Sequence, residues 1–197
     1  MLIFTYVNIK GEILKRKQTK NYPSTTSYQN NPNKKQFKKI IDLVENLIDK
    51  HEKILVCRGD LLAHNLPDHK DIQALIRKIK NHYGSDYYAY TWTCEDSSEH
   101  GKQGKHYHLA LFLNGHKFKS DYTHMEEILR WWTKRTGLKG SVSRFNKSKG
   151  DKNSVGLLRR SDTEKFEDVI YGLSYLCKTS QKQNSTDRLF SISHYKS

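Results

Sequence analysis

Two histidines on one predicted strand are the residues whose type and spacing most directly indicate chemistry. The segment 104–113, Gly-Lys-His-Tyr-His-Leu-Ala-Leu-Phe-Leu, has the composition of a strand. Because side chains alternate between the two faces of a strand, His106 and His108 share one face, while Tyr107 and the leucines share the other. Two imidazoles at this spacing predict a metal site, and the alternative interpretation is a pair of polar side chains near a strand edge.

A carboxylate beside the two imidazoles would complete a site for a divalent ion. The segment 87–95 is rich in Tyr, Thr and Trp and alternates as a strand, and a polar connection joins it to the histidine strand. Glu95 would lie at the end of this neighbouring antiparallel strand, so it is the candidate third ligand. Asp60 and His100 stay open as substitutes.

A predicted helix from Asp162 to Lys178 carries the candidate nucleophiles. Its apolar residues fall on one side at helical spacing, whereas Tyr171, Tyr175 and Lys178 cluster on the opposite side. A tyrosine can attack phosphorus covalently, and a lysine one turn further on can bind the phosphate or lower the pKa of the phenol. Tyr175, which has Lys178 three residues on, is therefore the predicted primary nucleophile and Tyr171 the second. The alternative is a row of exposed aromatic side chains.

The elements that must position these residues follow a recognisable order. In chain order they are a strand at 53–61, a helix from Pro67 to Gly84, strands at 87–95 and 104–113, a helix at 123–135 and a strand at 138–145. This order predicts an α+β fold, a ferredoxin-like split βαβ (βαββαβ) antiparallel sheet with helices packed on it and the histidine strand at its centre. We expect an additional helix from Asn33 to Lys50, and a strand from Asp187 to His194 after the tyrosine-bearing helix. Residues 146–163 are predicted to be a polar, basic loop.

The chain is expected to form one domain with an extension. Residues 1–33 are the predicted N-terminal extension: a short strand within residues 1–9, then a polar linker or arm over residues 15–33. Residues 34–197 are the predicted functional domain. No apolar run approaches the length of a membrane span, and three cysteines without a Cys-x-x-Cys pair indicate neither a disulfide framework nor a structural zinc site. We expect a reduced, cytoplasmic protein.

The charge of the chain favours a nucleic-acid partner. It has 35 Lys and Arg against 21 Asp and Glu, a formal net charge of +14, which suits a polyanion. The 12 tyrosines and 3 tryptophans suit base stacking, although most belong to the core. The candidate DNA-binding residues are basic or aromatic: Arg58, Tyr88, Tyr90, Trp92, Lys105 and Arg144.

The histidine and tyrosine motifs together resemble those of the HUH single-strand DNA endonucleases. The resemblance rests on Trp92, Glu95, His106-Tyr107-His108 and the segment from Tyr171 to Lys178, and covers about residues 53–194. It is closest to the replication initiators of filamentous phages and their prophage and island relatives. Two residues depart from the family pattern: Tyr107 stands where an aliphatic residue is usual, and Ser174 stands where a lysine often follows the first catalytic tyrosine.

The resemblance implies a specific activity. It is the Mg²⁺- or Mn²⁺-dependent, sequence-specific nicking and joining of single-stranded DNA through a 5′-phosphotyrosyl intermediate, which would initiate rolling-circle replication of a phage or mobile element. The expected partners are a single-stranded origin or hairpin and a host helicase and polymerase, since no Walker-type loop is present. The alternative is a non-catalytic single-strand binder with an RNA-recognition-like sheet, which would rest on Tyr88, Tyr90 and Trp92 at alternate positions.

Overall fold

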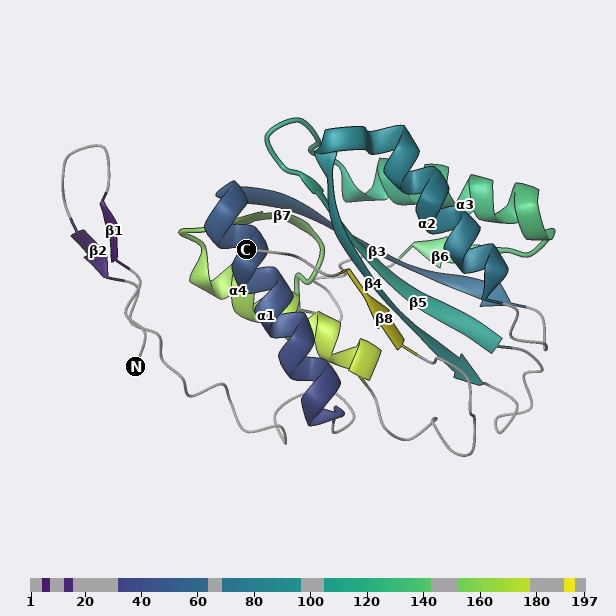
Figure 1. The fold of residues 1–197 in the computed structure, drawn as a ribbon, viewed down its shortest axis with the longest axis horizontal. Helices are drawn as coiled ribbons and strands as arrows, with labels where there is room; N and C mark the ends of the chain where they lie inside the picture. Colours follow the sequence, from purple (N-terminus) through teal and green to yellow (C-terminus); the bar gives the residue numbers. More distant parts are fainter. Residues whose placement is uncertain are drawn as a thin grey trace.

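An antiparallel sheet forms the centre of the molecule (Figure 1). The computed structural model describes residues 5–7, 13–15, 32–63, 69–96, 105–142, 152–177 and 190–193. Within these residues the strands of the sheet are β3 (Lys53–Ala63), β4 (Tyr87–Asp96), β5 (Lys105–Asn114), β6 (Gly140–Val142), β7 (Gly156–Arg159) and β8 (Phe190–Ile192). Their order is β6-β3-β5-β4-β8, and β7 also pairs with β3.

This strand order confirms the predicted ferredoxin-like arrangement. The strands β3, β4, β5 and β6 are those of the βαββαβ unit, and the order β6-β3-β5-β4 places its first and third strands at the centre. The histidine strand β5 pairs along its length with β3 on one side and with β4 on the other. Hydrogen bonds on both edges make β5 a rigid support for a site.

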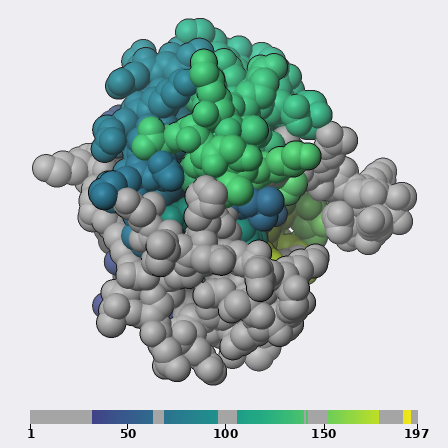
Figure 2. Space-filling model, turned by 90° about the vertical axis from the view of Figure 1, so that its right-hand side faces the viewer, coloured from purple at the N-terminus to yellow at the C-terminus, as the bar shows by residue number. Residues whose placement is uncertain are grey.

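Helices cover both faces of the sheet (Figure 1). The helices of the described residues are α1 (Lys34–His51), α2 (Lys70–Tyr83), α3 (Asp121–Thr136) and α4 (Thr163–Ser174), with 3-10 turns η2 (Gly84–Asp86) and η5 (Tyr175–Cys177). Side chains of Asn33, Ser120 and Asp162 accept backbone N–H groups at the starts of α1, α3 and α4, as helix caps do. Figure 2 shows α2 and α3 together covering the upper part of one side of the molecule.

The two faces of the sheet belong to two separate apolar cores. Ala110 and Phe112 of β5 pack with α1 and α4, whereas Leu109 and Leu111 pack with α2 and α3. The predicted alternation of the histidine strand is therefore confirmed. Because His108 is two residues before Ala110, it shares the face that α4 and η5 cover. The tyrosine-bearing helix thus faces the histidines.

The structure corrects the expectations for the segment 146–163 and for the end of the tyrosine-bearing helix. The segment 146–163 was expected to be a loop, but it contains β7, because Leu157 and Leu158 are apolar enough to pair with β3 and to bury Leu158 completely. The α-helix expected to run through Lys178 ends at Ser174, and a 3-10 turn follows it. Near the N-terminus, β1 (Thr5–Val7) pairs with a second strand, β2 (Ile13–Lys15).

Two further observations concern the cysteines and the helices. Cys57, Cys94 and Cys177 are buried, and none of the three is in a disulfide. Among the described helices, none is long and apolar enough to cross a lipid bilayer.

Candidate metal centre

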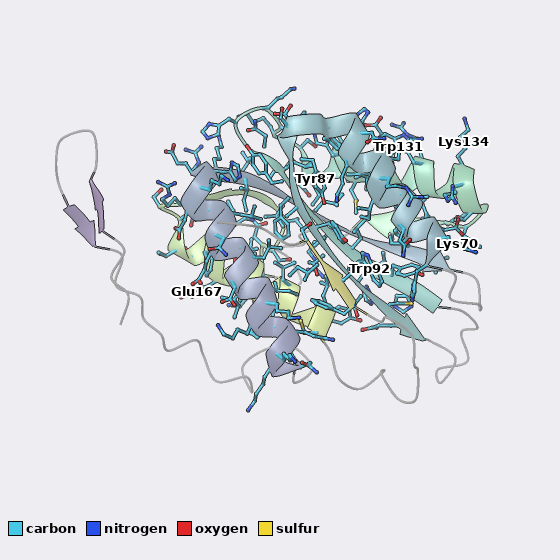
Figure 3. All side chains as sticks on the ribbon, in the orientation of Figure 1. Lys70, Tyr87, Trp92, Trp131, Lys134 and Glu167 are labelled. Carbon is cyan, nitrogen blue, oxygen red and sulfur yellow. The ribbon has the colours of Figure 1, made fainter. Side chains whose placement is uncertain are left out.

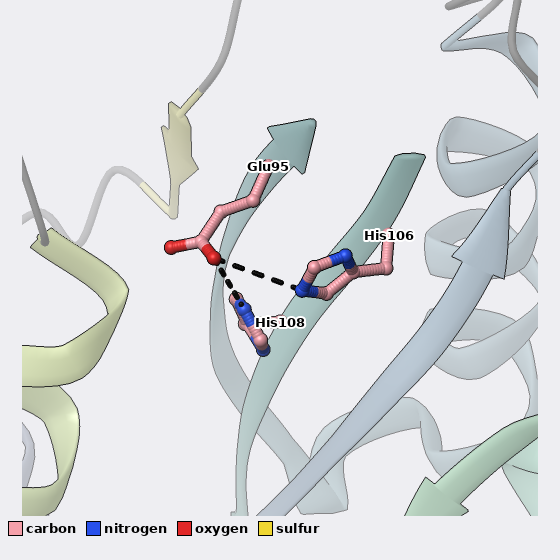
Figure 4. Close-up of side chains that lie close together, drawn as sticks. All are labelled: Glu95, His106 and His108. Atoms are coloured by element: carbon pink, nitrogen blue, oxygen red, sulfur yellow. Dashed lines mark ion pairs between the residues drawn. The ribbon is translucent and has the colours of Figure 1, made fainter. Parts of the chain in front are cut away.

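The pairing of β4 with β5 brings the three predicted metal ligands together. Glu95 lies directly opposite His106 in the antiparallel register, and Thr93 lies opposite His108. Directly opposite residues of paired strands point to the same face, so Glu95 joins both imidazoles on the side covered by α4. Figure 4 shows the carboxylate of Glu95 directed toward both rings.

The distances between these side chains suit a shared cation. Glu95 Oε2 lies 3.1 Å from His108 Nε2 and 3.6 Å from His106 Nε2. One ligand atom from each residue lies within 4.8 Å of the others. The structure therefore confirms that these groups are close enough together to form a metal site, and the identity of the metal stays a prediction.

The chemistry of the cluster also fits a cation. Glu95 is 2% exposed and His108 4% exposed. Glu95 Oε2 and His108 Nε2 are both buried, and apart from the ion-pair contacts within the cluster neither has a hydrogen-bond partner among the described residues. Buried polar atoms normally have partners, and a buried carboxylate is costly unless a positive charge compensates it. A divalent ion ligated by both atoms would satisfy them.

Asp60 of β3 contacts the other side of the His108 ring. It lies opposite His108 in the register of β3 and β5, and its Oδ1 is 2.6 Å from His108 Nδ1. Burial alone would lower the pKa of His108, but the hydrogen bond with Asp60 and the carboxylate of Glu95 raise it to about 9. In the metal-free protein, these two carboxylates favour the protonated His108 ring at neutral pH, and a cation bound at Nε2 would replace the proton on that atom.

Tyr175 lies beside the cluster. Its ring contacts that of His108 edge to face, with centroids 4.9 Å apart and an interplanar angle of 82°. Burial raises the pKa of the Tyr175 phenol, the charges of Glu95 and Asp60 raise it further, and the charge of Arg58 opposes them. The predicted primary nucleophile and the predicted metal ligands therefore meet at one place.

Tyr171 has different neighbours. Lys152 Nζ lies 5.1 Å from the centroid of the Tyr171 ring, and the Tyr171 carbonyl accepts a hydrogen bond from Ser174 Oγ. Because the α-helix ends at Ser174, Tyr171 lies in regular helix while Tyr175 lies in η5. Lys178 lies outside the described residues.

Of the three predicted DNA-binding aromatic residues, Trp92 is buried and the two tyrosines are half-buried. Trp92, labelled at the sheet in Figure 3, is 3% exposed. It packs edge to face against Tyr107 in the core that α2 and α3 cover, so it cannot stack on a base, and that expectation is wrong. Tyr90 is half-buried on the same face, and its hydroxyl contacts Ser191. Tyr88 stacks on His51 of α1, on the opposite face.

An irregularity in β4 separates Tyr88 from the other two aromatic residues. The register shifts between Tyr87 and Ala89, which breaks the strict alternation of faces. Helices also cover both faces of the sheet. The aromatic row on which the RNA-recognition-like alternative rests is therefore not formed.

Among the basic candidates, Arg58 is on the same face of the sheet as the candidate metal ligands. It is half-buried on β3, two residues before Asp60, and its Nη1 donates a hydrogen bond to Ser154 Oγ at 3.2 Å. The side chain of Lys105 and the whole of Arg144 lie outside the described residues.

Gly172, Ser154 and Lys165, which were not among the predicted site residues, bring α4 close to Arg58. A Cβ atom at Gly172 would lie 2.5 Å from Ser154 Oγ and 2.8 Å from Arg58 Nη1, and closer still to Ser154 Cβ. Lys165 Nζ donates to the carbonyls of Asn153 and Val155, which fixes this segment on α4. The only sequence signal for this contact is a glycine inside a helix, where glycine is unfavourable.

The fold and the site together define the class of the protein. It is an α+β protein whose ferredoxin-like sheet carries a His-His-Glu cluster beside a tyrosine. The model of the YagK/YfjJ C-terminal domain family matches residues 15–193, and the chain belongs to this prophage-related family. No curated protein and no solved structure matches the chain.

Proposed function

We propose that the chain is a metal-dependent endonuclease and strand transferase that nicks and rejoins single-stranded DNA through a tyrosine. The observation that carries this proposal is the contact between the Tyr175 and His108 rings, with centroids 4.9 Å apart. A phenol beside a buried cluster of two imidazoles and one carboxylate can approach a phosphate held at that cluster.

In the proposed reaction, Tyr175 Oη forms a bond to phosphorus while the bond from phosphorus to O3′ breaks. The phenol loses its proton and the leaving O3′ gains one, so the products are a 5′-phosphotyrosyl bond and a 3′ hydroxyl. When bound, a divalent metal would polarise a nonbridging phosphate oxygen and orient the phosphate. Rejoining reverses these steps and needs no nucleotide cofactor.

Arg58 would supply a protein cation to this reaction. Its guanidinium lies against α4 at Gly172, one helical turn before Tyr175. Within the described residues, its Nη1 donates a hydrogen bond to Ser154 Oγ. A guanidinium has five N–H donors, so several can serve a phosphate. Arg58 therefore fits a role in neutralising the phosphate that Tyr175 attacks.

The donor set favours Mn²⁺ over Mg²⁺ in our proposal. Two imidazole nitrogens and one carboxylate oxygen are offered by His106, His108 and Glu95. Mg²⁺ prefers oxygen ligands and retains its waters, whereas Mn²⁺ accepts a mixed set more readily.

The charge and the family support a mobile-element context. The net charge of +14, with Lys34, Lys35, Lys38 and Lys39 exposed on α1, suits a DNA partner. Membership of a prophage-related family agrees with initiation of rolling-circle replication of a phage or mobile element in the cytoplasm. A host helicase and polymerase would then extend the free 3′ hydroxyl.

A covalent adduct tests the proposal directly. The full chain is mixed with Mn²⁺ and a labelled single-stranded library of random sequence, and a denaturing gel detects label that stays with the protein. We expect an adduct with the wild type and with the control Tyr122→Phe, which alters an exposed tyrosine. Tyr175→Phe should lose the adduct. An equal yield from Tyr175→Phe, or no adduct with any protein, would overturn the proposal.

A further inference from the structure

Asp60 is a half-exposed carboxylate that makes the shortest contact at the candidate metal centre. Its side chain is 42% exposed, while that of His108 is 5% exposed, and the two are joined at 2.6 Å. At 2.6 Å a hydrogen lies between Asp60 Oδ1 and His108 Nδ1, and a carboxylate oxygen is a hydrogen-bond acceptor. Asp60 therefore accepts the hydrogen bond, and His108 Nδ1 carries the proton.

This hydrogen bond determines which nitrogen of His108 can bind a metal. When Nδ1 carries the proton, the neutral ring has its lone pair on Nε2. That atom lies 3.1 Å from Glu95 Oε2, within the cluster that also includes His106. The other tautomer would direct an N–H group at the cluster instead and could not ligate a cation there.

The geometry excludes the simpler role of Asp60 as a ligand to the same ion. Its hydrogen-bonded oxygen is next to Nδ1, and Nδ1 and Nε2 lie on different edges of the imidazole. Within the described residues, the group of possible ligands around Nε2 consists of Glu95, His106 and His108. A carboxylate beyond a histidine ligand orients the ring and raises its basicity.

We infer that Asp60 is a positioning residue for the metal centre: it holds the His108 ring and its tautomer so that Nε2 can bind a divalent cation, without ligating the cation itself. This inference deepens the proposed function and rests on it. It also assigns Asp60, which the sequence left open as a substitute ligand, to a different role from Glu95.

Metal binding without DNA tests the inference. The full chain is freed of metal with a chelator, and Mn²⁺ binding is measured by titration calorimetry at one pH. The variants are Asp60→Ala and Asp60→Asn, with Glu95→Gln as the ligand variant. The control is Asp42→Asn, which removes an exposed carboxylate that pairs with Lys38 on α1.

We expect Asp60→Ala to weaken Mn²⁺ binding by about 10- to 100-fold, the usual effect of losing such a partner. Asp60→Asn should weaken it less, because the amide oxygen can still accept the Nδ1 proton. Asp42→Asn should bind as the wild type does. Urea unfolding of each metal-free variant shows whether it is folded, and the graded order of Ala and Asn separates positioning from a general loss of structure.

The absorption spectrum of bound Co²⁺ separates positioning from ligation. At saturating Co²⁺, Asp60→Asn should keep the wild-type spectrum, because the ligands are unchanged, whereas Glu95→Gln should alter it. Unchanged Mn²⁺ affinity in both Asp60 variants would overturn the inference. So would an Asp60→Asn spectrum altered as in Glu95→Gln, or a wild-type chain that binds no Mn²⁺. Metal binding without any DNA adduct would overturn only the proposed function.

Discussion

Gly172→Ala probes the contact that places the tyrosine-bearing helix over the sheet. The added Cβ would lie 2.5 Å from Ser154 Oγ and 2.8 Å from Arg58 Nη1, and closer still to Ser154 Cβ. The guanidinium is the end of a flexible side chain and can move, but Ser154 Cβ moves only with its backbone. The hydrogen bonds from Lys165 to the carbonyls of Asn153 and Val155 oppose that movement.

The expected change in the free energy of unfolding is the result of two opposing effects. Overpacking of this kind costs about 1–3 kcal/mol. Alanine is better than glycine in a helix interior by about 1 kcal/mol, which offsets part of the cost. Because the contacts of the added Cβ are so short, we expect an overpacking cost of about 2–3 kcal/mol, so Gly172→Ala should lower the free energy of unfolding by about 1–2 kcal/mol.

Substitutions of Ser154 in the Gly172→Ala background test whether this residue causes the loss of stability. Ser154→Gly removes Ser154 Cβ and Oγ, so it should recover most of the stability lost in Gly172→Ala. Ser154→Ala keeps Cβ and should recover little. Urea unfolding of the single and double variants gives the coupling energy, expected to be about 1 kcal/mol or more for Ser154→Gly. A Gly172→Ala variant as stable as the wild type, or equal relief by both Ser154 variants, would refute the packing described.

Three further predictions concern the site and its charge. His106→Ala or His108→Ala should abolish Mn²⁺-dependent nicking but leave single-strand binding largely intact, because Lys and Arg supply most of the affinity; undiminished nicking by the double variant in the same samples would contradict the assignment. Affinity for single-stranded DNA should fall steeply with salt because of the +14 charge, and a binding isotherm insensitive to salt would exclude phosphate neutralisation as its source. In the metal-free protein the pKa of His108 is raised from 6.5 to about 9. The contribution of the protonated ring to the stability of the fold is therefore complete below pH 6.5 and is lost as the pH rises toward 9. The free energy of unfolding of the wild type, measured with urea in the presence of a chelator, should therefore fall by at most about 3 kcal/mol over this pH range. The variant His108→Gln should not show this fall. If the wild type loses no more stability than the variant, the prediction is refuted.

The sheet and the grouping of the candidate metal ligands were predictable because they depend on local rules. Alternation along a strand placed His106 and His108 on one face, and the short connection from residue 96 to 105 made β4 and β5 antiparallel neighbours. Glu95 then had to lie beside the histidines. The strand order followed from the sequence of helices and strands.

Other features depend on tertiary contacts that periodicity does not encode. The register shift between Tyr87 and Ala89 sends Tyr88 and Tyr90 to opposite faces, although their spacing suggests one face. Trp92 is in the core because α2 and α3 cover its side of the sheet. β7 was missed because only a few of its residues are apolar, and it is stabilised by pairing with β3.

The neighbours of the two tyrosines give a different criterion for choosing the nucleophile. In the sequence, Tyr175 is preferred because Lys178 follows it, but Tyr171 also has a lysine, since Lys152 Nζ lies 5.1 Å from its ring. A nearby lysine therefore does not distinguish them. The described contacts place Tyr175, and not Tyr171, against His108. If proximity to the metal ligands decides reactivity, Tyr171→Phe should retain initial cleavage and impair only a later strand transfer. Mass spectrometry of the DNA-linked peptide shows which tyrosine is the nucleophile. A wild-type adduct confined to Tyr171 would show that the adjacent Lys152, and not the candidate metal centre, selects the nucleophile.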